Sequence, residues 1–258
     1  MSSLASSPPG CGKNQNNMVT QTGDETHSGL ESSPVEFRLK RKLWCAGSAR
    51  KMAQLALLSN RIILENKERF PGAGPALLLP KHCSYRDILV EGVLLYQTTG
   101  RYASYVMKTG LSAFLELPGG VRIVRPKDIR RVKSREERRR LLEDARRRNA
   151  VTVEYLTWLY RNGECVISHP EGTRHADSMG VLQKEIVEHL VSVEKQCGLR
   201  VPMIPIGIEY ESTRPRSTIH LRVGEPLFSD QFKDTAAIMD AVSASIESLS
   251  FRRKSDSA

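Results

Sequence analysis

The segment ALLLPKHCSYRD (76–87) decides the predicted fold. Its first five residues (76–80) are apolar and predict a short buried strand that runs into His82. Asp87 follows in the turn and precedes apolar residues at helical spacing, so we expect it near the start of a helix. Because ligand sites in α/β sheets lie at the carboxyl ends of strands, His82 and Asp87 are candidate site residues.

Strand-like and helix-like patterns alternate through the rest of the chain. Ser134 and Glu137 form a capping box that opens a long helix, and Gly163 is its expected end. The predicted strands are 76–80, 102–108, 121–124, 164–169, 201–210 and 218–224, and the predicted helices after the first site segment are 134–161, 181–196 and 234–249. This alternation favours an α/β fold with a central mixed sheet flanked by helices.

The N-terminal part divides into two segments before the main domain, which we expect over residues 71–250. Residues 1–34 have the composition of a disordered tail. Residues 35–70 are expected to form an N-terminal amphipathic helix, with the helical pattern running from Val35 to about Lys67. Its apolar stripe consists of Trp44, Ser48, Met52, Leu55, Leu58 and Ile62. Two interpretations are open: this helix docks on the core, or it lies on anionic lipid with its basic residues around the stripe.

Composition limits the partners and the compartment. The formal net charge of +10 over 258 residues indicates an anionic partner, which nucleic acid, an anionic membrane or a phosphorylated substrate would each satisfy. The longest apolar runs are too short to span a bilayer, and the first thirty residues lack the apolar region of a signal peptide. The five cysteines form no C-x-x-C pair, so we expect free thiols in the cytoplasm.

The segment 130–148 concentrates positive charge, with ten Arg or Lys residues against four acidic ones. It is interpreted either as a solvated helix with i,i+4 ion pairs or as a surface that attracts anionic headgroups. Nucleic acid is disfavoured as a partner, because the nearby aromatic residues lie in a helical pattern and no nucleic-acid motif accompanies the charge.

Four ordered blocks give the chain a family resemblance. His82, Ser84 and Asp87 form an H-x-S-x-x-D block; the others are GGVRIVR (119–125), HPEGTR (169–174) and VPMIPIG (201–207). Together they resemble the glycerophospholipid acyltransferase family, which includes the lysophosphatidate acyltransferases. The resemblance covers roughly residues 70 to 230. Two departures are Lys81, where an Asn is common, and His169 in place of Phe.

The resemblance implies acyl transfer by a His–Asp pair without a protein nucleophile. Neutral His82 would take the proton from an acceptor hydroxyl as that hydroxyl attacks a thioester carbonyl. Asp87, bound to the other ring nitrogen, would fix the tautomer and stabilise the imidazolium. A cysteine nucleophile at Cys83 is disfavoured, since neighbours on an extended turn point apart.

The remaining site residues are expected to bind substrate. Arg174, Arg125 and Lys108 are candidate ligands of a phosphate, and Glu171 would orient Arg174 or bind an acceptor hydroxyl. The other expected members of the substrate site are Gly119, Gly172, Thr173 and Pro205. We expect neither a metal nor a cofactor, because His169 and His175 lack partners at zinc spacing.

The predicted activity is transfer of a fatty acyl group from acyl-CoA or acyl-ACP to lysophosphatidate, a phosphorylated glycerolipid, to give phosphatidate in phospholipid synthesis. The protein would associate peripherally with an anionic membrane surface. Two alternatives are open. The acceptor would instead be glycerol 3-phosphate or another lyso-lipid such as a lyso-ornithine lipid, or the protein would be a non-enzymatic, basic lipid- or nucleic-acid-binding protein on the same scaffold.

Overall fold

The computed structural model describes residues 36–125, 129, 132–212 and 216–251. The contacts divide the chain into two units, Met1–Glu36 and Phe37–Ala258, and every helix and strand described below belongs to the second. The tail expected over residues 1–34 lies outside the described residues.

Seven strands form one central sheet in the order β1-β7-β6-β2-β5-β3-β4. Their bounds are β1 Arg61–Glu65, β2 Ala76–Pro80, β3 Ala103–Lys108, β4 Gly120–Ile123, β5 Cys165–Ile167, β6 Met203–Glu211 and β7 Thr218–Val223. The five strands from β6 to β4 run parallel, whereas β7 runs antiparallel to β6 and pairs in parallel with β1. The mixed sheet confirms the predicted fold class, and the parallel strands bring five carboxyl ends to one edge.

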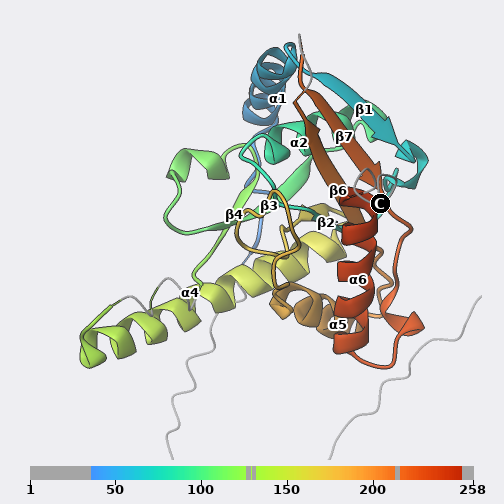
Figure 1. Cartoon of the computed structure of the whole chain (residues 1–258). Coiled ribbons are helices and arrows are strands. Elements are labelled where there is room, and N and C mark those ends of the chain that lie inside the picture. The colour runs from blue at the N-terminus through green and yellow to red at the C-terminus, as the bar shows by residue number, and fades with distance from the viewer. Residues whose placement is uncertain (1–35, 126–128, 130–131, 213–215, 252–258) are drawn as a thin grey trace, which may run out of the picture. The chain divides into compact units, whose positions relative to one another are not determined.

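Helices cover both faces of this sheet (Figure 1). Their bounds are α1 Leu43–Leu57, α2 Asp87–Thr99, α4 Arg135–Arg161, α5 Glu185–Cys197 and α6 Thr235–Ser250, with three short 3-10 turns, η1 Lys67–Arg69, η2 Ala113–Glu116 and η3 Ser229–Gln231. Strand β2 shows how the layers are formed. Leu78 packs with α1 and α2, whereas Leu77 and Leu79 pack with α4, α5 and α6. A strand buried on both faces needs a continuous apolar run, which residues 76–80 supply.

The helix expected over residues 35–67 is wrong at both ends. The observed α1 spans only Leu43–Leu57, and Arg61–Glu65 forms the edge strand β1. The segment from Arg61 pairs residue by residue with β7, so tertiary pairing overrides the helical spacing of the apolar residues. Since β1 completes the sheet, the boundary expected near residue 70 falls inside the folded unit.

The orientation of α1 also differs from a helix that docks through its apolar stripe. Its small side chains Cys45, Ala46 and Ala53 are buried with Leu57, whereas the large apolar side chains of the stripe face outward. Trp44 is 70% exposed, for example. The helix therefore packs on the core through one face and presents a second apolar face to the surroundings.

Two other helices begin where local contacts dictate. The Ser134 hydroxyl accepts a hydrogen bond from the Glu137 amide, which confirms the predicted start of α4. The helix expected from residue 181 begins only at Glu185. The reason is that the Gln183 amide donates to the Pro170 carbonyl, so the segment before α5 is held against the 169–174 turn.

Candidate active site

The carboxyl ends of four parallel strands bring candidate site residues to one edge of the sheet. His82 lies two residues beyond β2, and His169 lies two residues beyond β5, the strand next to it. Lys108 ends β3, and Arg125 lies two residues beyond β4. Since side chains far apart in the sequence meet at this edge, it is the place where a site is expected.

His82 and Asp87 form a hydrogen-bonded pair. The ring nitrogen His82 Nδ1 lies 2.9 Å from Asp87 Oδ2, and the Asp87 side chain is fully buried. The His82 side chain keeps 17% exposure, and its Nε2 atom makes no hydrogen bond within the described part of the chain. With the Nδ1 proton donated to Asp87, Nε2 is the atom that can accept a proton from a substrate.

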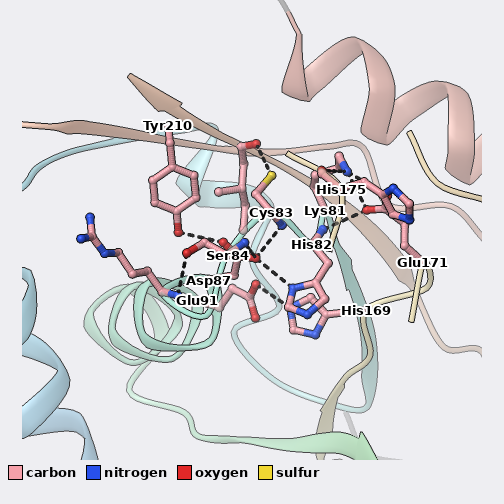
Figure 2. A network of polar contacts seen from close by, with 12 residues as sticks. Lys81, His82, Cys83, Ser84, Asp87, Glu91, His169, Glu171, His175 and Tyr210 are labelled. Carbon is pink, nitrogen blue, oxygen red and sulfur yellow. Dashed lines mark hydrogen bonds and ion pairs between the residues drawn. The ribbon is translucent and has the colours of Figure 1, made fainter. Parts of the chain in front are cut away.

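Asp87 is held by three further donors. Its Oδ2 atom accepts from the amides of Cys83 and Ser84, both at 2.7 Å, and its Oδ1 atom accepts from the Tyr210 hydroxyl at 2.7 Å (Figure 2). Burial and Asp87 raise the pKa of Tyr210, so its hydroxyl remains a donor. Tyr210 lies near the end of β6, and no spacing in the sequence relates it to Asp87.

Glu171 occupies a different position from the one expected. Its carboxylate binds Lys81 Nζ through both oxygens at 2.8 Å, and both side chains are completely buried. It also accepts from the amides of His82 and Gly180. The Glu171 carboxylate is thus paired with Lys81 in this structure, and its expected contact with substrate or Arg174 stays a prediction.

The 169–174 turn requires its glycine. Gly172 has φ +61°, and a Cβ atom there would lie 2.5 Å from the Gln183 side chain. The Gly172 carbonyl accepts a hydrogen bond from the Arg125 guanidinium at 2.7 Å. This contact joins the second and third sequence blocks, and it gives Arg125 a position next to the turn.

Comparisons with known proteins identify a family for this chain. A family model described as Acyltransferase matches residues 61–209, more than half of the 258-residue chain. The chain belongs to the acyltransferase family. A search of curated proteins finds no match. Among solved structures, the chain is similar to the 1-acyl-sn-glycerophosphate (LPA) acyltransferase PlsC from Thermotoga maritima, with TM-score 0.51, 17% identity, and coverage of 78% of this chain and 76% of that chain.

Thr173 and Arg174 lie at the exposed end of the 169–174 turn. The Arg174 guanidinium lies 3.6 Å from the centre of the Tyr85 ring, a cation–π contact with the residue between Ser84 and Arg86 of the first block. Both side chains are accessible, since Arg174 is exposed and Tyr85 is 73% exposed. An accessible guanidinium beside the base can meet an anionic substrate.

Two further residues of the expected substrate site lie within or next to strands of the sheet. Gly119 has φ +125°, and a Cβ atom there would lie 2.9 Å from the Ala103 carbonyl, so it permits the close pairing of β3 with β4. Pro205 is buried within β6 opposite Leu79. Lys108 differs from both, because it ends β3 with an exposed side chain.

Cys83 lacks the surroundings of a nucleophile. Its thiol lies 3.4 Å from the Ile208 carbonyl, and burial together with Asp87 raises its pKa to about 12. A thiol with so high a pKa is neutral at physiological pH and reacts slowly. These contacts support His82 as the group that acts in the acyltransferase.

The site contains a second histidine–carboxylate pair that the sequence did not predict. His169 Nε2 lies 3.1 Å from Glu91 Oε1, and the His169 ring lies against the His82 ring with a centroid separation of 4.1 Å and a tilt of 39°. Glu91 is one helical turn beyond Asp87 on α2, so the two carboxylates point to the same side. The i,i+4 spacing of Asp87 and Glu91 in an otherwise apolar helix is the sequence feature that could have indicated a second carboxylate in the site.

Three of these groups lie close enough to be compared with a metal site. Ligand atoms of His82, Asp87 and His169 lie within 4.8 Å of one another. Asp87 Oδ2 already accepts from His82 and from two amides, and His169 is bound to Glu91. The donors are thus matched with acceptors within the cluster, an arrangement that serves proton transfer.

Proposed function

We propose that this acyltransferase moves a fatty acyl group from acyl-CoA or acyl-ACP to the free hydroxyl of lysophosphatidate, giving phosphatidate. The observation that carries the proposal is the His82–Asp87 pair, with Nδ1 engaged and Nε2 facing outward at the strand ends. A neutral imidazole in this state is a general base for an alcohol. The likeness to an LPA acyltransferase supports the fold on which the pair is placed.

The proposed reaction needs no protein nucleophile. The acceptor hydroxyl gives its proton to His82 Nε2 while its oxygen forms a bond to the thioester carbonyl carbon. Asp87 stabilises the imidazolium that results. The tetrahedral intermediate then expels the thiolate, the C–S bond breaks, and His82 returns the proton to sulfur. The products are the ester and the free thiol.

Arginine at the edge of the site supports a phosphorylated acceptor. Arg174 is exposed on the turn that begins with His169, and Arg125 binds the same turn through the Gly172 carbonyl. Guanidinium groups bind phosphate with paired hydrogen bonds, and Lys108 adds a point charge at the end of β3. The acceptor phosphate would lie over these groups while its hydroxyl reaches His82.

The outward face of α1 supports contact with a membrane surface. Its exposed apolar side chains are Leu43, Trp44, Met52, Leu55 and Leu58, each more than 60% exposed. The amide of Lys42 donates to the Leu117 carbonyl, which brings the start of α1 against η2, where Phe114 is 67% exposed. Within the described residues, no helix is long and apolar enough to cross a bilayer. An apolar surface with adjacent Lys42 and Lys51 suits peripheral binding.

The exposed half of α4 supplies further positive charge. It projects beyond the sheet, and its arginines form i,i+4 ion pairs such as Arg140–Glu136 and Arg148–Asp144 (Figure 1). Those pairs confirm the predicted solvated helix. Because its basic residues outnumber the acidic ones, the segment would still attract anionic headgroups.

The direct test is acyl transfer with radiolabelled acyl-CoA and acyl-ACP over a panel of acceptors. We expect the highest kcat/KM with lysophosphatidate and loss of transfer in His82→Ala. A preference for glycerol 3-phosphate or a lyso-ornithine lipid would keep the chemistry and replace the acceptor. No transfer to any acceptor, from either donor, would support the non-enzymatic alternative instead.

A further inference from the structure

The contact between the rings of His169 and His82 follows from the strand order of the sheet. Strands β2 and β5 are parallel neighbours with Leu78 opposite Ile167, so the segments that follow them leave the sheet side by side. Each places a histidine two residues beyond its last strand residue. The two rings lie 4.1 Å apart between centroids and are tilted by 39° (Figure 2). The ring of His169 therefore covers one face of the proposed base.

Glu91 holds the other end of His169. Its carboxylate is 2% exposed, with Oε1 at 3.1 Å from His169 Nε2. Its second oxygen, Oε2, is buried with no hydrogen-bond partner among the described residues. A buried carboxylate without a counter-charge is costly, so Glu91 requires the proton that His169 can share with it. His169 and Glu91 are a proton-sharing unit rather than two independent groups.

We propose that His169, held by Glu91, is a positioning residue for His82: it orients the imidazole by ring-to-ring contact, and the proton that it shares with Glu91 sets the acidic limit of activity. This inference rests on the proposed acyl transfer, in which His82 must start neutral and become a cation. A neutral ring on its face permits that change, whereas a cationic ring opposes it.

Several charged or titratable groups face His169. The groups that face it are Asp87 and Glu91 from α2, His82 from the end of β2, and Glu171 from its own turn, with Lys81 bound to Glu171. Burial by itself lowers the pKa of His169, but the Glu91 carboxylate and hydrogen bond, with Asp87 and Glu171, raise it above its usual value. For Glu91, burial has the opposite effect and raises the pKa of the carboxyl group.

These neighbours favour a proton on His169. As the pH falls and His169 takes that proton, the His82 ring lies against a cationic ring, 4.1 Å away between centroids. The positive charge opposes the formation of a second cation on His82, which the proposed chemistry requires. Chemistry should therefore slow on the acid side of the pH profile as His169 becomes protonated.

The activity test uses two variants that remove the charge in different ways. His169→Phe/Glu91→Leu keeps an aromatic ring on His82 and leaves no buried carboxylate, while Glu91→Gln keeps a hydrogen-bond acceptor for His169. In both, we expect the acid limb of kcat/KM to move to lower pH by about one unit, the effect of one neighbouring charge. His189→Phe is the matched control, since His189 contacts Thr157 and Tyr160 on α4.

A second measurement does not depend on activity. Histidine NMR spectra of the full chain over a range of pH, assigned with His82→Ala and His189→Phe, should show that the His82 ring signals respond to the protonation of His169, and this response should be absent in His169→Phe/Glu91→Leu. Circular dichroism establishes that each variant is folded. If no acceptor receives an acyl group but the His82 signals still respond to His169, the proposed function is wrong and the interaction between the two histidines is supported.

The opposite result would overturn the inference. If the NMR titration of His82 and the acid limb are the same in wild type, Glu91→Gln and His169→Phe/Glu91→Leu, His169 has no effect on the base beyond packing. A shift of equal size in His189→Phe would likewise contradict it, because the effect would then be general to any histidine removed.

Discussion

At the scale of single residues, the site depends on how completely Asp87 is held. Four donors surround its carboxylate: His82 Nδ1, the amides of Cys83 and Ser84, and the Tyr210 hydroxyl. Hydrogen bonds of this kind fix the orientation of the carboxylate. The position and the tautomer of His82 follow from Asp87, which leaves Nε2 as the ring atom for the acceptor hydroxyl in the proposed reaction.

We expect His82→Ala to reduce acyl transfer by a factor of about 10² to 10⁴, because the general base is lost while little packing changes. Single-turnover kinetics with acyl-CoA measures the loss, and circular dichroism checks the fold. Cys83→Ser is the neighbouring control and should retain most activity. A folded His82→Ala protein with wild-type turnover would contradict the mechanism, and a dead Cys83→Ser protein would restore the cysteine nucleophile.

The His169–Glu91 pair should also appear in the pH dependence of stability. Both pKa values are raised in the folded protein, so the folded state binds more protons than the unfolded state. The contribution of His169 is present below its unfolded pKa and lost as the pH rises through the folded value. Ionising the buried Glu91 carboxyl group also costs free energy as the pH rises. Both groups therefore lower the stability of the folded protein as the pH increases.

We therefore expect wild type to lose free energy of unfolding, relative to His169→Phe/Glu91→Leu, as the pH rises from about 4.3 through and beyond about 6.5, the ordinary values of the two groups. Urea unfolding at several pH values within that window measures the difference. A difference that stays constant, or that grows in favour of wild type at high pH, would show that the pair does not share a proton.

At the scale of elements, one buried ion pair joins β2 to the 169–180 segment. Lys81 follows β2, and Glu171 binds both its ammonium and the amides of His82 and Gly180. The turn that carries Arg174 is thereby fixed relative to the base. These contacts of Glu171 hold the two elements against each other.

Lys81→Met should destabilise the protein by about 3 to 5 kcal/mol, because it leaves the Glu171 carboxylate buried without its counter-charge. Lys81→Met/Glu171→Met should regain part of the loss, since no charge is left inside, although two amides then lack an acceptor. Denaturant unfolding measures both. If the double variant is no more stable than Lys81→Met, the cost does not come from an unpaired charge.

Arg174 on that turn is expected to serve the acceptor. Arg174→Ala should raise the KM for lysophosphatidate about tenfold or more, the value of one charge-assisted contact, with a smaller change in donor KM. Arg139→Ala, a surface arginine of α4 bound to Glu143, is the control. A selective rise in donor KM would place Arg174 at the thioester site.

At the scale of the whole folded unit, α1 has two different faces. Its small side chains pack on the core, and its large apolar side chains are exposed among the described residues. The buried face agrees with the interpretation that the helix docks on the core. Contact of the exposed face with anionic lipid stays a prediction.

We expect Trp44→Ser/Leu55→Ser to weaken binding to anionic vesicles. Burying each of these apolar side chains in lipid contributes about 1.5 to 3 kcal/mol to the free energy of binding. Liposome co-sedimentation measures it, and salt should weaken wild-type binding as the Debye length falls from about 10 Å at 0.1 M to about 3 Å at 1 M. Val181→Ser, at a residue that is 90% exposed before α5, is the control. Equal binding to neutral vesicles, or none to either, would contradict the membrane surface and favour glycerol 3-phosphate.

The sequence by itself determined the strand–turn–helix around His82, the alternation that predicts an α/β sheet, and the start of α4. These features depend on local physics: an apolar run buried on both faces, a five-residue turn, and a capping hydroxyl. The pairing of His82 with Asp87 was within reach for the same reason, because both residues lie in one short segment.

The other features depend on contacts between segments that are distant in the sequence. Arg61–Glu65 is a strand because β7 offers it an edge, and Glu171 is sequestered because Lys81 emerges beside its turn. Tyr210 reaches Asp87, and His169 reaches Glu91, across separations of 123 and 78 residues. No spacing in the sequence encodes such contacts, since they depend on which strands become neighbours, and strand order follows from packing the whole sheet between its two layers of helices.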